Sequence, residues 1–500
     1  MTITRESWSA RSGFIFAAAG SAIGLGNIWR FPYVAYENGG GAFLIPYLIA
    51  LVTAGLPLLL LDYNLGHKYK GGAPLAYRSI YKPAEALGWW QVMVCVFIGL
   101  YYASVLAWAG SYIGFSFGQQ WQGAPEEFFF THHLQSSGSL LNFSFVPGLF
   151  YPLVTVWAIT LTILYLGVRK GLEWANKIFI PLLFVLFSIL VIQALRLPGA
   201  VQGLNAFFTP NWPAMLDYKV WLAAYGHIFF SLSVGFGIMV TYASYLKPNT
   251  NLTGSGMVVA FANSSFEVLA GIGVFAALGF MAYSQGVAVN EVVTGGIGLA
   301  FIAFPKLISS LGASGDWFGF LFFTSLSIAG VTSLVSVMQV PVAAVQDKTG
   351  WSRHKTVTLV GGSTAVLSTL LFSTRSAITL VDILDHFINN IGIVAGGVVS
   401  IVLVSWFRRS LLKPLIEHNN RISSIKLGKG WTFMLTVITP GVLLASMLLS
   451  IHALLRQGYS NYNSSLVLMV GWGSLLCCLL AALLLCKLPR RGQREEKSHE

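Results

Sequence analysis

The chain has 500 residues, of which 55% are hydrophobic and only 10% are charged. A soluble globular protein carries about 25% charged residues, so this composition excludes a soluble globular fold. The formal net charge of +12 would suit a nucleic-acid partner, but the basic residues lie in short segments between apolar stretches. That distribution is typical of the loops of a polytopic membrane protein and argues against binding to nucleic acid.

Apolar stretches of about 20 residues are long enough to cross a bilayer as helices. The sequence predicts an all-α membrane protein with twelve transmembrane helices, and we expect the first of them to be retained rather than cleaved as a signal peptide. The predicted spans are residues 13–36, 41–66, 88–118, 148–168, 172–195, 220–246, 256–284, 316–346, 355–373, 377–406, 431–455 and 464–487.

The Lys and Arg residues predict the orientation. If Met1 lies in the cytoplasm, the cytoplasmic segments hold 24 of the 30 basic residues. Because cytoplasmic loops are enriched in Lys and Arg, we expect both termini to be cytoplasmic in a multi-pass cell-membrane protein, with a bacterial inner membrane as the expected location. The four cysteines all lie in apolar segments, which favours small buried side chains over redox or metal chemistry.

Two spans carry helix breakers at mid-length. The first reads GSAIGLGN at its centre, and the sixth reads SLSVGFG. Interrupted helices at corresponding places in two halves indicate a transporter built from inverted repeats. We therefore expect one transporter domain over residues 1–500, with inverted five-helix repeats at 13–195 (spans one to five) and 220–406 (spans six to ten) and two additional helices at 431–487.

A broken helix exposes chemistry that an intact helix hides. A break near residues 22–26 would free N–H groups that can hold a carboxylate and C=O groups that can hold a cation. Gly24 and Gly26 would let a ligand approach the backbone, and Asn27 would add an amide oxygen. The alternative is a glycine-rich face for close helix packing, although Asn27, Arg30 and Pro32 argue against it.

Three motifs carry a resemblance to a known family. They are GSAIGLGNIWRFPYVAYENGGGAFLIPY in span one, FFSLSVGFG with TYASY in span six, and AGVTSLVSVMQ in span eight. The chain resembles the neurotransmitter:sodium symporters, and is most similar to their prokaryotic amino-acid members, typified by the bacterial leucine transporter. The resemblance covers spans one to ten, whereas spans eleven and twelve match only in character. It implies sodium-coupled uptake by alternating access.

The resemblance implies two sodium sites made of neutral oxygen ligands. The first would use Ala22, Asn27, Ser231 and Asn263, together with the substrate carboxylate. The second would use Gly20, Ile23, Ala329, Thr332 and Ser333. Hydroxyl groups that bond back to their own helix are the alternative interpretation of the AGVTS motif.

The resemblance also implies a substrate cavity between the two breaks. The expected substrate-binding residues are Ser21, Ala22, Gly24, Leu25, Gly26, Ile98, Tyr102, Phe230, Ser231, Ser233, Phe236, Ser333 and Val337. In monoamine carriers of the family an aspartate stands where this chain has Gly24. An uncharged position here implies a substrate that brings its own carboxylate, and the apolar walls favour a neutral, hydrophobic side chain.

Charged residues inside the spans are functional candidates because they are costly in lipid. By resemblance, Arg30 and Asp385 form an outer gate, and Arg5, Trp8, Tyr245 and Asp347 an inner gate. Glu267 stands where chloride-dependent relatives have serine, which predicts chloride independence or a proton-linked role shared with His227. Asp62 replaces the usual glutamate of span two.

We therefore predict sodium-coupled secondary active uptake of neutral, hydrophobic L-amino acids. A sodium-coupled carrier of another small zwitterion, an antiporter of related fold, and a channel or ligand-sensing receptor on the same fold are the alternatives. An enzyme is not expected, because the sequence offers no clustered catalytic set and no nucleotide-binding motif.

Overall fold

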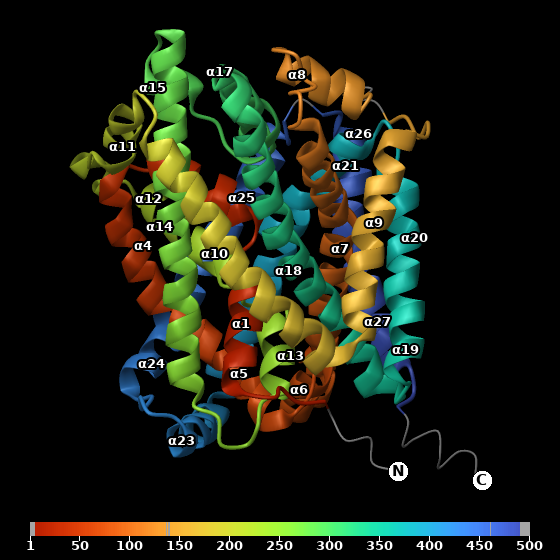
Figure 1. Ribbon diagram of the computed structural model, residues 1–500. Coiled ribbons are helices and arrows are strands. Elements are labelled where there is room, and N and C mark those ends of the chain that lie inside the picture. Colours follow the sequence, from red (N-terminus) through yellow and green to blue (C-terminus); the bar gives the residue numbers. More distant parts are fainter. Residues whose placement is uncertain (1–5, 137, 139–140, 461, 491–500) are drawn as a thin grey trace.

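The computed structural model describes residues 6–136, 138, 141–460 and 462–490. Within these residues the structure contains helices and two isolated β-bridges, and no strand. The long helices run roughly parallel in one bundle, and the described ends of the chain lie at the same end of it (Figure 1). Glu6 pairs with Arg353 there at 2.8 Å, and Arg490 lies 3.5 Å from Glu85.

Ten helical spans in the described part of the chain are apolar enough to cross a bilayer, with lengths of 19 to 38 residues. Each overlaps a predicted span, because long apolar runs fix where a helix must lie. Their labelled helices are α4 and α5 (Leu44–Ala50 and Leu56–Tyr69), α7 (Glu85–Phe115), α9 (Pro147–Tyr165), α10 (Trp174–Leu195), α14 (Leu252–Gln285), α18 (Gly315–Thr349), α19 and α20 (Arg353–Thr356 and Gly362–Phe372), α21 and α22 (Ala377–Phe387 and Val394–Val402), α24 and α25 (Lys429–Phe433 and Thr439–Gln457), and α26 and α27 (Ser464–Leu466 and Gly473–Lys487).

The first span is broken where the sequence predicts. Helix α1 (Arg11–Ala22) ends before Ile23, and α2 (Leu25–Trp29) with α3 (Phe31–Glu37) continues at an angle of 54°. The Asn27 side chain accepts a bond from the Gly24 N–H at 2.8 Å, so a side chain replaces the lost intrahelical partner. The prediction of a break near residues 22–26 is confirmed.

The sixth span is also broken. Helix α12 (Tyr218–Ser231) and α13 (Ile238–Ser244) are separated by residues 232–237, in which Ser233, Gly235 and Gly237 have positive φ angles of 53°, 84° and 86°. Glycine adopts this left-handed region without steric cost, whereas Ser233 does so under strain. The bent first span is an eleventh candidate, and α12 with α13 would supply the twelfth; the count of twelve and the inverted repeat stay predictions.

Shorter helices cover the two ends of the bundle. The predicted loop 285–315 contains the apolar stretch Gly296–Ser310, and its Phe304 ring stacks on Phe322 of α18 with centroids 3.9 Å apart. This stretch includes α16 (Gly296–Gly298) and α17 (Phe304–Ser310). The other short helices are α6 (Ala73–Ile80), α8 (Pro125–Glu127), α11 (Ala200–Phe208), α15 (Val289–Val292) and α23 (Leu412–Ile422).

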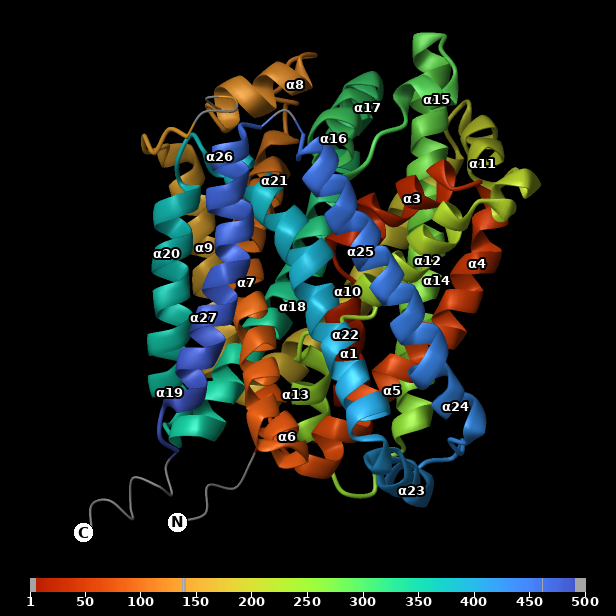
Figure 2. The same cartoon turned by 180° about the vertical axis from the view of Figure 1, so that it is seen from behind.

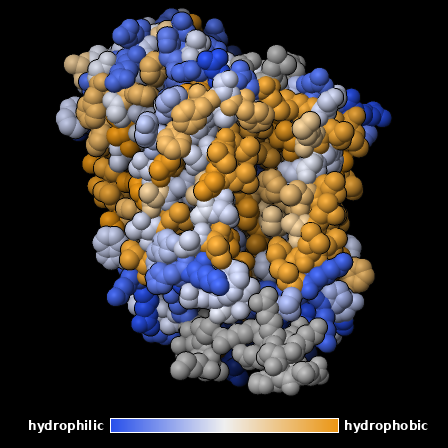
Figure 3. Space-filling model, turned by 90° about the vertical axis from the view of Figure 1, so that its right-hand side faces the viewer, coloured by the Kyte–Doolittle hydropathy of each residue, from blue (hydrophilic) through white to orange (hydrophobic). Residues whose placement is uncertain are grey.

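The surface matches a membrane setting. Figure 3 shows a hydrophobic band around the middle of the molecule between two hydrophilic ends. Figure 2 shows α25 and α27 on the outside of the bundle, and only 22% of the apolar window that includes α25 is buried inside the protein. The outer helices therefore offer their side chains to lipid, while the broken spans lie inside.

Close packing of α5 against α13 provides a test of the fold. A Cβ built on Gly66 would lie 2.0 Å from the Val240 carbonyl oxygen, whereas one on Gly110 of α7 meets no atom within 4 Å. We expect Gly66→Ala to destabilise the protein by about 1–3 kcal/mol through overpacking. Gly110→Ala should be neutral or slightly stabilising, because glycine weakens a helix interior. Thermal melting of the two purified variants in detergent measures the difference, and equal melting temperatures would contradict this packing.

Candidate functional site

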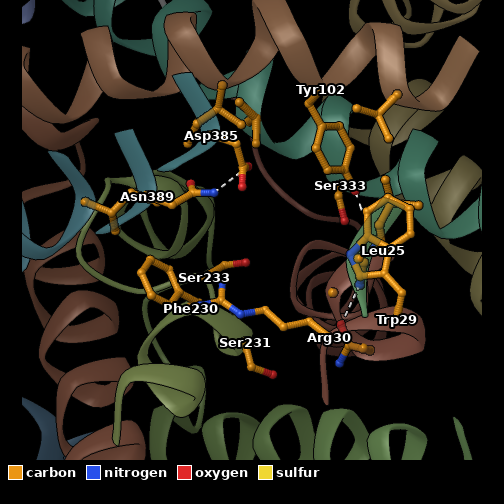
Figure 4. Close-up of a pocket in the computed structure, with 18 of the residues that line it drawn as sticks. Leu25, Trp29, Arg30, Tyr102, Phe230, Ser231, Ser233, Ser333, Asp385 and Asn389 are labelled. Atoms are coloured by element: carbon orange, nitrogen blue, oxygen red, sulfur yellow. Dashed lines mark hydrogen bonds between the residues drawn. The ribbon is translucent and has the colours of Figure 1, made fainter. Parts of the chain in front are cut away.

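A cavity of about 410 Å³ lies between the two helix breaks. All thirteen residues predicted to bind substrate line it, from Ser21 in α1 to Val337 in α18. Figure 4 shows side chains from both broken spans, α7, α18 and the span of α21 and α22 facing this common space. The structure thus brings the predicted residues together, while their individual roles stay predictions.

One side of the cavity presents backbone N–H groups. Helix α2 begins at Leu25, and the Leu25 amide lies 3.5 Å from the Tyr102 hydroxyl of α7. Gly26 follows in the first turn and also lines the cavity, where a Cβ would meet no atom within 4 Å. The first amides of a helix lack intrahelical partners, so this edge attracts an anionic group. At Gly24, in contrast, a Cβ would lie 2.9 Å from the Ser333 hydroxyl oxygen.

Part of the cavity lining is apolar. Ile98, Phe236 and Val337 come from three different spans, and each keeps 6% of its surface exposed. These three side chains offer no polar group to a substrate side chain that packs against them. A ligand that spans the cavity would therefore place a charged end at α2 and an apolar end at these residues.

Three of the four predicted ligands of the first sodium site form one buried network, and the fourth, Ala22, lines the cavity. Asn27 Nδ2 donates to Asn263 Oδ1 at 2.8 Å, and Asn263 Nδ2 donates to Ser231 Oγ at 2.5 Å. The Ser231 hydroxyl in turn donates to Glu267 Oε1 at 2.6 Å. Spans one, six and seven thus meet in one small buried region, where the Asn27 Oδ1 atom accepts from the Gly24 N–H. The amide and hydroxyl oxygens of this region and its single carboxylate are ligand types that suit a hard monovalent cation.

Glu267 is the charge in this network and is fully buried. Its Oε1 atom accepts from Asn27 Nδ2 at 3.2 Å and lies 2.8 Å from His227 Nε2. Its Oε2 atom accepts a very short bond from the Tyr47 hydroxyl. Tyr47 ends the motif that carries the family resemblance, but it was not among the predicted site residues, because the sequence does not show that its hydroxyl reaches Glu267. These donors lower the cost of holding a carboxylate away from water.

The predicted second sodium site lies where α1 ends beside α18. The Ser333 hydroxyl lies 3.4 Å from the Gly20 carbonyl oxygen and 3.5 Å from that of Ser21. Thr332 donates to the Ala329 carbonyl oxygen at 2.9 Å. Ile23 has an extended backbone (φ −79°, ψ 98°), which turns its carbonyl out of the helix. The five predicted ligands therefore lie where the end of α1 meets α18. The Thr332 hydroxyl bonds back to its own helix, as the alternative interpretation of the AGVTS motif expects, and the sodium site stays a prediction.

The two residues predicted to form the outer gate line the cavity without closing it. In the described structure Arg30 and Asp385 form no ion pair: the Arg30 guanidinium lies 4.9 Å from the Phe230 ring centroid, and Asp385 accepts from Asn389 at 2.6 Å (Figure 4). A second hollow shares Arg30 and Asp385 and continues toward Tyr459, past the α16 region. The cavity thus leads toward the end of the bundle opposite the chain ends.

The inner side is packed shut. Trp8 keeps 1% of its surface exposed, and its indole N–H donates to the Tyr242 carbonyl oxygen at 2.9 Å. The Trp8 backbone N–H bonds to the Tyr245 carbonyl oxygen at 3.1 Å. Asp347 accepts from the Gly72 N–H at 2.7 Å. The predicted gate residue Arg5 lies outside the described residues.

Comparisons with known proteins agree with this arrangement. Residues 5–137 and 119–492 match the family described as the Sodium:neurotransmitter symporter family. The chain belongs to this family. Its fold class and its assignment as a transporter rather than an enzyme are thereby confirmed, and so is sodium-coupled transport across a membrane.

Individual relatives span most of the chain. A sodium-dependent transporter of Methanocaldococcus jannaschii is 41% identical over 465 residues, which cover 93% of this chain and 94% of the relative. The sodium-dependent serotonin transporter of Drosophila melanogaster is 29% identical and covers 95% of this chain and 82% of its own. Among solved structures, MhsT in complex with L-phenylalanine superposes with a TM-score of 0.74 at 32% identity, covering 89% of this chain and 100% of that one.

The oxygen network around Asn27 predicts a loss of sodium binding when its amide is removed. We expect Asn27→Ala to weaken sodium binding about 10-fold or more, because an interaction with a charged group contributes about 1.5–3 kcal/mol. Asn38→Ala is the matched control, since the Asn38 side chain bonds only to the Val34 carbonyl at the end of α3. Binding of radioactive sodium to purified protein measures both. Unchanged affinity in Asn27→Ala would remove Asn27 from the ion site.

Proposed function

We propose that this symporter takes up neutral, hydrophobic L-amino acids together with sodium, by alternating access and without chloride. The observation that carries the proposal is the mixed lining of the cavity between the breaks. Leu25 and Gly26, the first residues of α2, line it together with the apolar side chains of Ile98, Phe236 and Val337. A zwitterion with an apolar side chain matches both parts of this lining.

Gly24 supports an intact amino acid over an amine. A Cβ at this position would already lie 2.9 Å from the Ser333 hydroxyl and 3.4 Å from that of Tyr102, and the glycine carries no charge to pair with a substrate amine. The carboxylate must then come from the substrate, where it would meet the α2 amides and Tyr102. The amino group would meet carbonyls freed at the breaks, near Ala22 and Phe230. That MhsT binds L-phenylalanine supports a substrate class with bulky side chains.

Sodium and substrate would bind as one unit. The first ion would lie among Ala22, Asn27, Ser231 and Asn263, with the substrate carboxylate as a further ligand. The second would lie among Gly20, Ile23, Ala329, Thr332 and Ser333. Because each group of ligands joins span one to another span, ion binding would fix the break geometry before substrate arrives.

Transport would follow from movement of the broken spans. The cavity now leads outward past Arg30 and Asp385, while Trp8 packs beneath it. In the next state Arg30 would pair with Asp385 above the substrate, and the Trp8 contacts with α13 would open below it. The membrane potential contributes about 2.3 kcal/mol per charge per 100 mV to sodium entry. With the basic residues on the cytoplasmic side, both termini lie in the cytoplasm of a cell-membrane protein.

Transport in liposomes tests the proposal. We expect purified protein to accumulate one or more of the large neutral amino acids under an inward sodium gradient, in a screen of all twenty. Uptake should stop when potassium replaces sodium. Accumulation of a different small zwitterion would change the substrate class, and ligand binding without accumulation would instead indicate a receptor.

Glu267 predicts independence from chloride. Its carboxylate already supplies a negative charge beside the first ion site, 2.6 Å from the Ser231 hydroxyl. Replacing chloride by gluconate should therefore leave uptake by the native protein unchanged. Glu267→Ser should make uptake depend on chloride, because the negative charge must then come from solution. Chloride-dependent uptake by the native protein would show that Glu267 does not play this part.

A further inference from the structure

The loop that breaks span six is held by side chains outside the predicted site. Asp62 of α5 accepts from the Gly235 N–H at 3.2 Å. Gln91 of α7 donates from Nε2 to the Gly235 carbonyl oxygen at 2.9 Å, and the Cys95 thiol donates to the Phe236 carbonyl oxygen at 3.2 Å. Three side chains from two neighbouring spans therefore bond to consecutive backbone groups of the unwound segment.

These contacts lie beyond the reach of water. Gln91 keeps 1% of its surface exposed and Cys95 none. A backbone carbonyl without a partner in this setting costs several kcal/mol, so the unwound segment depends on donors supplied by its neighbours. The Gln91 amide is oriented further by the Tyr77 hydroxyl, 3.3 Å from Nε2, and Tyr77 in turn lies 2.5 Å from the Ser400 hydroxyl.

The span of α21 and α22 closes the other side of the loop. A Cβ on Gly396 would lie 3.0 Å from the Gly235 carbonyl oxygen, and a Cβ on Gly235 would lie 3.0 Å from the Gly397 Cα atom. The loop therefore has little room to move away from α7 in that direction. The side-chain donors of α7 hold the loop on one side, and the backbone of α22 blocks it on the other.

The loop of residues 232–237 contributes Phe236 to the lining of the proposed substrate cavity. Phe236 accepts a hydrogen bond from Cys95 through its carbonyl oxygen and lines the cavity, as Ile98 and Val337 do. A shift of the loop would move this ring relative to Ile98, which lies on α7, one turn beyond Cys95. The width of the apolar end of the cavity thus depends on the bonds from Gln91 and Cys95.

We propose that Gln91 and Cys95 are positioning residues that set the size discrimination for the substrate side chain. They act through the loop: the two donors fix Phe236, and Phe236 limits the space at the apolar wall. This inference rests on the proposed amino-acid transport, because it assigns the apolar wall to the substrate side chain. It places the control of selectivity in polar groups that do not touch the substrate.

The test compares two substrates of the native protein: the transported amino acid with the largest side chain and the one with the smallest. In proteoliposomes under a sodium gradient, Cys95→Ala and the near-isosteric Gln91→Met should raise KM for the larger substrate about 5-fold, the effect of one lost hydrogen bond of about 1 kcal/mol. KM for the smaller substrate should change less than about twofold. Cys95→Ser should keep the native ratio of the two KM values, because its hydroxyl can donate to the same carbonyl.

Two controls separate positioning from general damage. Cys477→Ala changes an exposed cysteine and should leave both KM values as in the native protein. Sodium binding measured without substrate should be unchanged in every variant, since the ion ligands lie elsewhere. If Gln91→Met does not fold, Cys95→Ala and Cys95→Ser still decide the question.

Several outcomes would overturn the inference. A native KM ratio in the folded Cys95→Ala protein would do so, and so would a sodium affinity that falls in step with substrate affinity, which indicates loss of structure. Absence of sodium-driven uptake by the native protein is a different result, because it rejects the proposed function itself. The two failures are therefore distinguishable within one set of measurements.

Discussion

The constraint on which this structure depends is that a peptide group inside lipid must have a hydrogen-bond partner. Most spans meet it by remaining helical, because an α-helix pairs its own N–H and C=O groups. Spans one and six do not, and their free backbone groups must form hydrogen bonds with side chains or ligands. The Asn27 side chain accepts a bond from the Gly24 N–H, and the Asp62 carboxylate accepts one from the Gly235 N–H. The groups left over, at α2 and at the end of α1, are the ones that face the cavity.

The candidate site follows from this division of the backbone groups into those with a hydrogen-bond partner in the protein and those without one. Partners from the chain hold the breaks open, so the remaining amides and carbonyls keep fixed positions and need little rearrangement to bind. Ser233 stores local strain at φ 53°, and its hydroxyl donates to the Ser21 carbonyl oxygen at 2.9 Å, which joins the two breaks directly. This bond links the broken segment of span six directly to the end of α1.

Much of this was predictable because the signals are local. Apolar length placed the spans, and GSAIGLGN and SLSVGFG placed the breaks, since glycine and polar residues are costly in a lipid-embedded helix. Contacts between distant spans were not predictable from local pattern. Tyr47 reaches Glu267, and Gln91 reaches Gly235, across helices whose rotation depends on packing of the whole bundle. The sequence likewise could not say that Arg30 would lie over Phe230 in this state.

Glu267 has a thermodynamic consequence of its own. A counter-anion recruited from the medium occupies its place only in proportion to its concentration, and each occupancy carries an entropic cost of association. The Glu267 carboxylate is covalently attached to α14, so it is always present and cannot diffuse away. Under the proposed function, the protein itself would then supply the negative charge beside the first ion site, whatever the halide content of the surroundings.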